Sequence, residues 1–329
     1  MPVTSEFAVS KKWLIVSILF YLPLSLLDLV HKYFIRGETD LILNPIQKFI
    51  FSTSTIYHVV FTFFYTLTLL LNRNILDEII LQIGKLEEYK NKKISSLVAW
   101  HTFFGIYLAV HIAILIMFGF TNSSGTSNFA VQLIFHITPY FRSIMVLLLY
   151  CNITKLAGNA VQQLKKTLIP SFHQVIFKYE KFEDAIQLIR LNNQFFSLQL
   201  ILFAAQCLIF ITLHAYNIIH NIRFNIKNFD FFKILLESGD MVGGFQLLML
   251  YCTTVSDTKN KIEKFNRKIF KLLMKHRELR KNERLKNQIL RNCEVDFNVC
   301  GFFYGGYPLV TSILEAVVTY IVMLIQFNP

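Results

Sequence analysis

The sequence predicts an all-α, polytopic membrane protein with seven transmembrane helices. Of its 329 residues, 54% are hydrophobic and only 16% are charged, whereas soluble domains carry about 25% charged residues. Phe occurs 33 times, which indicates that much of the surface faces lipid rather than water. The apolar residues also gather into long stretches, and about 20 such residues in a row suffice to cross a bilayer as a helix.

Seven stretches qualify as membrane spans. They run approximately over 13–35, 46–71, 95–120, 129–154, 196–221, 232–256 and 301–327. The first is longer than the apolar core of a signal peptide and no A-x-A-like site follows it, so we interpret it as a retained helix. The sixth is the weakest because Gly239, Asp240, Gly243 and Gly244 interrupt it. We expect the whole chain, 1–329, to form a single seven-helix membrane domain.

The distribution of basic residues predicts a cytoplasmic N-terminus and an extracellular C-terminus. In this orientation 26 of the 33 Lys and Arg residues lie in cytoplasmic segments and six lie outside, as the positive-inside rule requires. Asn122 begins a glycosylation sequon in an outer loop, and Asn152 begins a second one at an inner helix end. This orientation is opposite to that of G-protein-coupled receptors, and their Asp-Arg-Tyr signature is missing. We expect a multi-pass protein of the plasma membrane.

Several function classes are disfavoured by the composition. The net charge is +12, but the basic residues lie between apolar runs and do not alternate with exposed aromatics, so we do not expect nucleic-acid binding. The five cysteines show no C-x-x-C spacing, which argues against a zinc site or a disulfide scaffold. No H-E-x-x-H, G-x-S-x-G or P-loop motif occurs. We therefore expect neither an enzyme nor a cofactor.

Two cytoplasmic segments, 155–195 and 257–300, have helical character. In the second, apolar side chains recur in steps of three and four, namely at Ile262, Phe265, Ile269, Leu272, His276 and Leu279. This pattern predicts a helix that continues from the sixth span into the cytosol, followed by a break and a return. The stripe could pack on neighbouring helices of the same chain, or it could assemble subunits, since heptad-like runs often mark association.

The last span, 301–327, contains the most informative polar pattern. Gly305, Gly306 and Pro308 should break or kink it, which leaves an outer part over 309–327. At about 100° per residue, one arc of about 80° holds four polar side chains, those of Thr311, Glu315, Thr319 and Gln326. Aligned polar groups inside a membrane face either water or a partner helix. The pattern alone leaves both a pore lining and interhelical hydrogen bonding open.

The end of this span resembles the signature of a known family. Thr319-Tyr320, five further residues, and Gln326-Phe327 resemble the T-Y-x5-Q-F signature of insect gustatory receptors, relatives of the insect odorant receptors. The Gly-Phe-Phe at 301–303 looks like the G-x-F that begins the seventh helix in that family, and the segment 191–197 resembles the opening of its fifth. One departure is Tyr-Gly-Gly at 304–306, where the family often has an acidic residue.

The resemblance implies a homo- or heterotetrameric, tastant-gated, non-selective cation channel. In that family the outer part of helix seven from each subunit lines one central pore, and cytoplasmic helical extensions, here 155–195 and 257–300, form an anchor. The gate would lie at Gln326 and Phe327, with Thr319, Glu315 and Thr311 also along the pore. The partners implied are a small-molecule tastant, permeating cations and the lipid bilayer. Two alternatives stay open: a transporter of small molecules, and a non-conducting ligand-binding subunit that needs a co-receptor.

The family binds tastants within the outer half of each helix bundle, which selects polar and aromatic candidates at that depth. They are Tyr57, His58, Tyr107, His111, Gln132, His136, Tyr140, His214, Asn217, Gln246 and Tyr320. Each of them could instead form a hydrogen bond between helices. Although four of them are histidines, nothing in the sequence fixes their mutual distances, so we do not expect a metal site.

Overall fold

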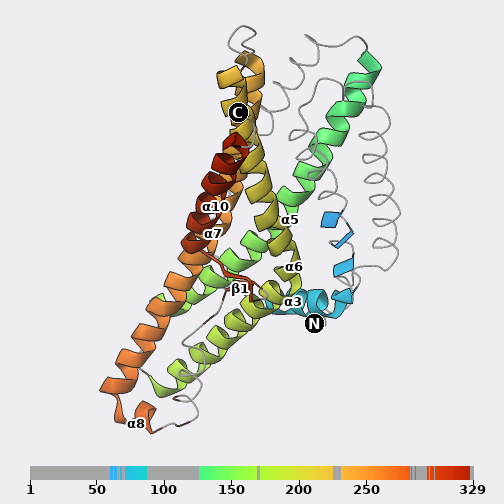
Figure 1. Cartoon of the computed structure of the whole chain (residues 1–329). Helices are drawn as coiled ribbons and strands as arrows, with labels where there is room; N and C mark the ends of the chain where they lie inside the picture. Colours follow the sequence, from blue (N-terminus) through green and yellow to red (C-terminus); the bar gives the residue numbers. More distant parts are fainter. Residues whose placement is uncertain are drawn as a thin grey trace.

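The computed structural model describes residues 60–61, 63–64, 67–68, 71–86, 126–168, 171–224, 231–281, 283, 286, 295, 297–299 and 301–326. In this part of the chain α-helices dominate (Figure 1). They are α3 (Arg73–Leu86), α5 (Thr126–Lys166), α6 (Phe172–Phe224), α7 (Phe231–Lys275), α8 (Arg277–Arg280) and α10 (Tyr307–Gln326). The two short strands are β1 (Asn298–Val299) and β2 (Phe303–Tyr304). The expectation of a predominantly helical chain is confirmed.

Three long helices form the centre of the described structure. Each of α5, α6 and α7 packs against the other two, while α10 lies along α7 and α6 (Figure 1). Three helices are long and apolar enough to cross a membrane among the residues that the structure describes, with qualifying segments at Ser143–Lys166, His173–Arg223 and Tyr307–Gln326. The seven-helix count and the direction of the termini extend beyond the described residues and stay predictions.

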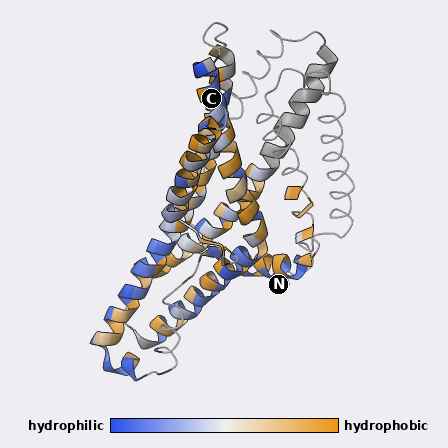
Figure 2. Cartoon of the chain, in the orientation of Figure 1, coloured by the Kyte–Doolittle hydropathy of each residue, from blue (hydrophilic) through white to orange (hydrophobic). Residues whose placement is uncertain are grey.

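The long helices run well past the ends of the predicted spans. The α5 helix continues to Lys166, α6 already begins at Phe172, and α7 continues to Lys275. Figure 2 shows that their ends near α8 are rich in hydrophilic residues, whereas hydrophobic residues predominate along the middle of α6. The segments 155–166, 172–195 and 257–275 are therefore helical, as their periodicity predicted. Whether they lie in the cytosol is a prediction from the charge distribution.

The apolar stripe predicted for 257–279 is largely buried. Ile262, Phe265 and Ile269 are 2% exposed or less, and the Phe265 ring stacks on Phe182 of α6 with the ring centroids 4.4 Å apart. The helix itself ends sooner than the stripe, because His276 has an extended backbone (φ −110°, ψ 112°). Leu279 is buried from α8, a separate four-residue helix.

The last span was predicted to begin at 301 and to be broken at Gly305, Gly306 and Pro308, and no helix precedes the two glycines within 301–306. Residues 298–304 instead form an antiparallel β-hairpin that pairs Asn298 with Tyr304 and Val299 with Phe303. Gly301 allows the turn because its φ is +79°, a region that other residues rarely adopt. The helix begins at Tyr307, so Pro308 lies in the first turn, where its missing N–H leaves no helical hydrogen bond unmade.

Candidate functional site

The α10 helix has two distinct faces. Leu309, Ile313 and Val317 recur every four residues and are 4–6% exposed, which forms the stripe that packs on the rest of the chain. The polar residues predicted to line a pore, Thr311, Glu315, Thr319 and Gln326, are all exposed. Helical geometry places them away from the buried stripe. Within one chain, this polar face is therefore not used for packing.

The hydroxyl groups on this face bond back to their own helix. Thr319 Oγ1 donates to the Glu315 carbonyl oxygen at 2.8 Å, and Thr311 Oγ1 donates to the Tyr307 carbonyl oxygen at 3.4 Å. These bonds satisfy the hydroxyl donors without a partner helix. The predicted gate residue Phe327 lies outside the described residues. Tyr320, a predicted ligand residue, is 50% exposed on α10.

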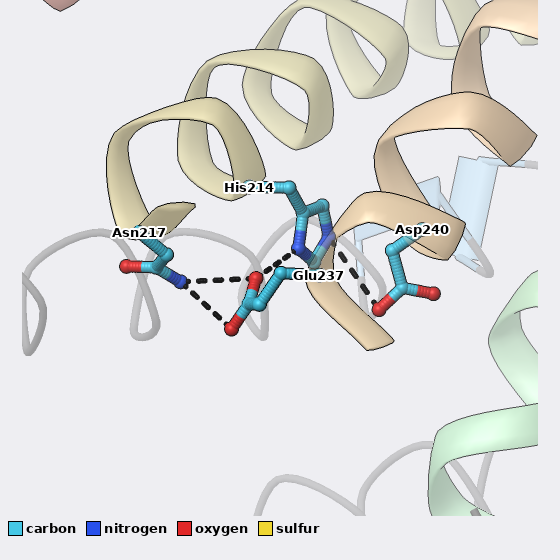
Figure 3. A network of polar contacts seen from close by, with 4 residues as sticks. All are labelled: His214, Asn217, Glu237 and Asp240. Carbon is cyan, nitrogen blue, oxygen red and sulfur yellow. Dashed lines mark hydrogen bonds and ion pairs between the residues drawn. The ribbon is translucent and has the colours of Figure 1, made fainter. Parts of the chain in front are cut away.

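A second candidate site lies between α6 and α7. His214 Nδ1 lies 2.5 Å from Glu237 Oε2, and its Nε2 lies 3.9 Å from Asp240 Oδ2. Asn217 Nδ2 donates to both carboxylate oxygens of Glu237, at 3.2 Å each. Figure 3 shows the imidazole ring between the two carboxylates. We call these four residues the His214 cluster.

The His214 cluster links two helices through a matched spacing. His214 and Asn217 are three residues apart on α6, and Glu237 and Asp240 are three residues apart on α7, so each pair presents one helix face. Sequence reasoning named the first pair as ligand candidates but missed Glu237 entirely and treated Asp240 only as a disturbance of a weak span. The sequence does contain a signal for this contact, because each of two predicted spans carries a pair of polar residues three positions apart.

The cluster lies at one end of a polar stripe on α6. At 100° per residue, six polar side chains fall within an arc of about 80°, namely Asn192, Gln199, Gln206, His214, Asn217 and Asn221. All except Asn217 are less than 10% exposed. Buried polar side chains inside a membrane protein join helices or line a ligand path. Of these six residues, only His214 and Asn217 were predicted as ligand residues.

The inner part of this stripe joins α6 to α5. Asn192 Nδ2 donates to the Tyr150 carbonyl oxygen at 3.1 Å and to Thr154 Oγ1 at 3.0 Å. The Tyr150 hydroxyl donates to Asn193 Oδ1 at 2.8 Å, and its ring packs edge-on against Phe196. The segment 191–197, noted for its resemblance to a family motif, thus supplies an interhelical junction.

The remaining ligand candidates stay predictions, because the structure describes the side chain of only one of them, Gln246. Gln246 is half-buried on α7, and its Oε1 accepts no hydrogen bond from the described residues. The backbone positions of Gln132, His136 and Tyr140 belong to α5. Tyr57, His58, Tyr107 and His111 lie outside the described residues. Within the described ranges no group of three or more His, Cys, Asp or Glu side chains is arranged to hold a metal ion.

Comparisons with known proteins identify the family. A family model for the 7tm chemosensory receptors matches residues 2–329. The fold is similar to that of the insect olfactory receptor OR5 from Machilis hrabei, with 12% sequence identity, a TM-score of 0.60, and 99% of this chain and 91% of that chain covered.

The structure of the same receptor in complex with eugenol matches at 10% identity and a TM-score of 0.67, covering 100% of this chain and 93% of that one. These identities show the fold alone. No curated protein matches the chain. The family model spans nearly the whole sequence and agrees with the resemblance carried by its last helix, so the chain belongs to the 7tm chemosensory receptor family.

Proposed function

We propose that this chain is a tastant-gated, non-selective cation channel of the plasma membrane. Four subunits surround one pore, and α10 of each subunit lines it. The observation that carries the proposal is the division of α10 into a buried apolar stripe and an exposed polar face with Thr311, Glu315 and Thr319. Family membership supports a chemosensory role.

The exposure of α10 favours contacts outside the single chain. In its most apolar 18-residue stretch only 22% of the residues are buried, compared with 50% in the stretch of α6 and 61% in that of the α5 segment Ser143–Lys166. A carboxylate such as Glu315 is costly against lipid, whereas a water-filled pore hydrates it and a ring of such groups attracts cations. Assembly of four subunits with these polar faces inward covers the exposed surface of α10 and also keeps Glu315 in contact with water.

The gate of this channel lies at Gln326 and Phe327. Neighbouring side chains on a helix point about 100° apart, so a modest rotation of α10 exchanges an apolar constriction for a polar one. An apolar constriction blocks ions by excluding water. In this proposal Phe327→Ala leaks current without ligand, while normal closure of that variant would contradict the assignment.

Assembly also involves the polar ends of the long helices. Three large apolar side chains there are more than half exposed: Phe177, Phe270 and Met274. Together with the exposed basic face of α7, they support an anchor formed by 155–195 and 257–300 of each subunit. We place this anchor in the cytosol on the basis of the charge distribution.

The ligand is a small organic molecule held in the outer half of the bundle. The His214 cluster and Gln246 supply hydrogen-bonding groups at this depth. The complex of the similar receptor OR5 with eugenol supports a ligand of this size.

Whole-cell recording tests the proposal. The full chain is expressed alone in cells without native chemoreceptors, its surface expression is verified, and sugars, bitter compounds and an acid pulse are applied. We expect a ligand-evoked cation current that Gln326→Ala alters, while the control Leu81→Met, at a side chain of α3 that is 54% exposed, leaves it unchanged. A surface-expressed chain that stays silent would oppose a self-sufficient channel and favour a subunit that needs a co-receptor.

The His214 cluster also favours one alternative, a transporter. Paired ionisable groups between membrane helices are used in proton relays. A transporter would accumulate labelled substrate in proteoliposomes without a ligand-gated conductance, and Glu237→Gln would stop this accumulation. A conductance without accumulation would exclude this alternative.

A further inference from the structure

Two adjacent glycines form the connection between the β-hairpin and α10. Gly305 N donates to the Phe297 carbonyl oxygen at 2.7 Å, and Leu309 N donates to the Gly306 carbonyl oxygen at 3.1 Å. Gly306 has a φ of +123°, which side-chain-bearing residues rarely adopt. The backbone before α10 is therefore held by the hairpin on one side and by the first turn of the helix on the other.

Both glycines lie directly against α7. A Cβ atom at position 305 would be 2.6 Å from Tyr251 Oη and 3.3 Å from Tyr251 Cζ. A Cβ atom at position 306 would be 3.1 Å from Ser256 Oγ. Because real Cβ atoms do not approach another atom to 2.6 Å, any larger residue at 305 displaces either Tyr251 or the start of α10.

Tyr251 has little room to yield. It is 1% exposed, and its ring centroid lies 5.6 Å from that of Tyr150 on α5 and 6.4 Å from that of Phe203 on α6. Because aromatic rings of α5 and α6 pack around Tyr251 of α7, its hydroxyl group is held in place next to Gly305. Well-packed interiors respond to added volume by shifting whole elements.

We propose that Gly305, Gly306 and Tyr251 form a joint through which α7 sets the orientation of α10. The α7 helix is continuous from the His214 cluster near one end, past Tyr251, to Lys275. A shift of α7 at the cluster is thus passed to the start of the helix that carries the polar face. The consequence for gating rests on the proposed channel function, but the joint itself does not.

Cysteine labelling measures the orientation of α10 without any need for current. Thr319→Cys and Val317→Cys are introduced separately into the full chain, which is solubilised in detergent and treated with a small maleimide. Labelling of the chain without an introduced cysteine is subtracted. Thr319 is exposed and Val317 is 4% exposed, so the ratio of the two labelling rates reports how α10 is turned.

We expect Gly305→Ala to change this ratio by about fivefold or more, because the added methyl group overpacks the joint. Tyr251→Phe alone should leave the ratio unchanged, because it removes only the Oη atom that lies closest to position 305. The double variant Gly305→Ala/Tyr251→Phe should return toward the original ratio. Gly239→Ala is the matched control on α7, because a Cβ there meets no atom within 4 Å.

Each outcome decides the proposal. An unchanged ratio in Gly305→Ala, or a change that Tyr251→Phe does not reduce, would overturn the joint. Loss of the folded chain is recognised by size-exclusion chromatography, and Gly305→Ser in the Tyr251→Phe background then repeats the comparison with a second side chain. If labelling confirms the joint while no ligand evokes current, the joint stands and the channel proposal fails.

Discussion

Gly158 of α5 lies directly against Thr258 of α7, where a Cβ atom at position 158 would be 3.0 Å from Thr258 Oγ1. Thr258 Oγ1 in turn donates to the Thr154 carbonyl oxygen at 3.5 Å. One helical turn further on, Lys261 Nζ donates to Asn159 Oδ1 at 3.0 Å. The two helices thus approach closely at a small residue and remain connected by polar contacts along their polar ends.

Gly158→Ala should destabilise the chain. The added methyl group would press against the Thr258 side chain, which has to move by a few tenths of an ångström, and overpacking of this kind costs about 1–3 kcal/mol. The melting temperature of the detergent-solubilised chain should fall accordingly. In the control, Gly84→Ala on α3, the new Cβ meets no atom within 4 Å and should keep or raise the melting temperature. Equal effects of both variants would contradict the close approach.

Asn192→Ala should remove a buried junction between α5 and α6. Asn192 is 0% exposed and donates two hydrogen bonds, so its loss should cost about 1–3 kcal/mol. Gln194, two residues further on and exposed, provides the control Gln194→Ala, which should be nearly neutral. Thermal unfolding in detergent compares the two, and a neutral Asn192→Ala would show that the junction contributes nothing.

Glu237→Ala should destabilise the chain more than Glu237→Gln does. Alanine leaves His214 and Asn217 without their acceptor, whereas glutamine keeps a carbonyl oxygen for one of them, and an unmet buried polar group costs about 1–3 kcal/mol. A double-mutant cycle with His214→Ala should show coupling between the two residues. The exposed Glu278→Ala on α8 is the control. Additive effects of the two substitutions would mean that the contact between His214 and Glu237 does not contribute to the free energy of unfolding.

The sequence predicted the helical parts best where the periodicity was strong. Burial of Ile262, Phe265 and Ile269 follows from their spacing alone, because a helix presents such residues on one face. The hairpin at 298–304 escaped prediction, since two-residue strands carry no period and only the glycine at the turn marks them. The end of α7 before His276 could not be predicted either, because no Gly or Pro lies near it.

The candidate site was predicted in part. The faces of α10 could be derived from the sequence because the polar residues all belong to one helix. A helix turns by about 100° per residue, so the spacing of these residues alone places them on one face. The His214 cluster requires the register between α6 and α7, which no single-helix pattern contains. For that reason His214 and Asn217 were identified as polar candidates while Glu237, which contacts both, was missed.

The predicted orientation has its own test in glycosylation. Asn122 should carry a glycan if its loop faces outside, whereas Asn152 on α5 should not. Treatment with a glycosidase should increase the electrophoretic mobility of the chain, and Asn122→Gln should abolish this change. Asn152→Gln serves as the control and should behave like the unchanged chain. A glycan at Asn152 would reverse the proposed orientation of α5.

Modification of single cysteines during recording tests whether the polar face of α10 lines an ion pathway. Thr319→Cys and Ile313→Cys are expressed in full-length chains, and a water-soluble, charged thiol reagent is applied while the ligand holds the channel open. We predict that the reagent changes the current by about twofold or more at Thr319→Cys, on the exposed face. At Ile313→Cys, on the buried stripe, it should have no effect. A response at Ile313→Cys with none at Thr319→Cys would contradict the account.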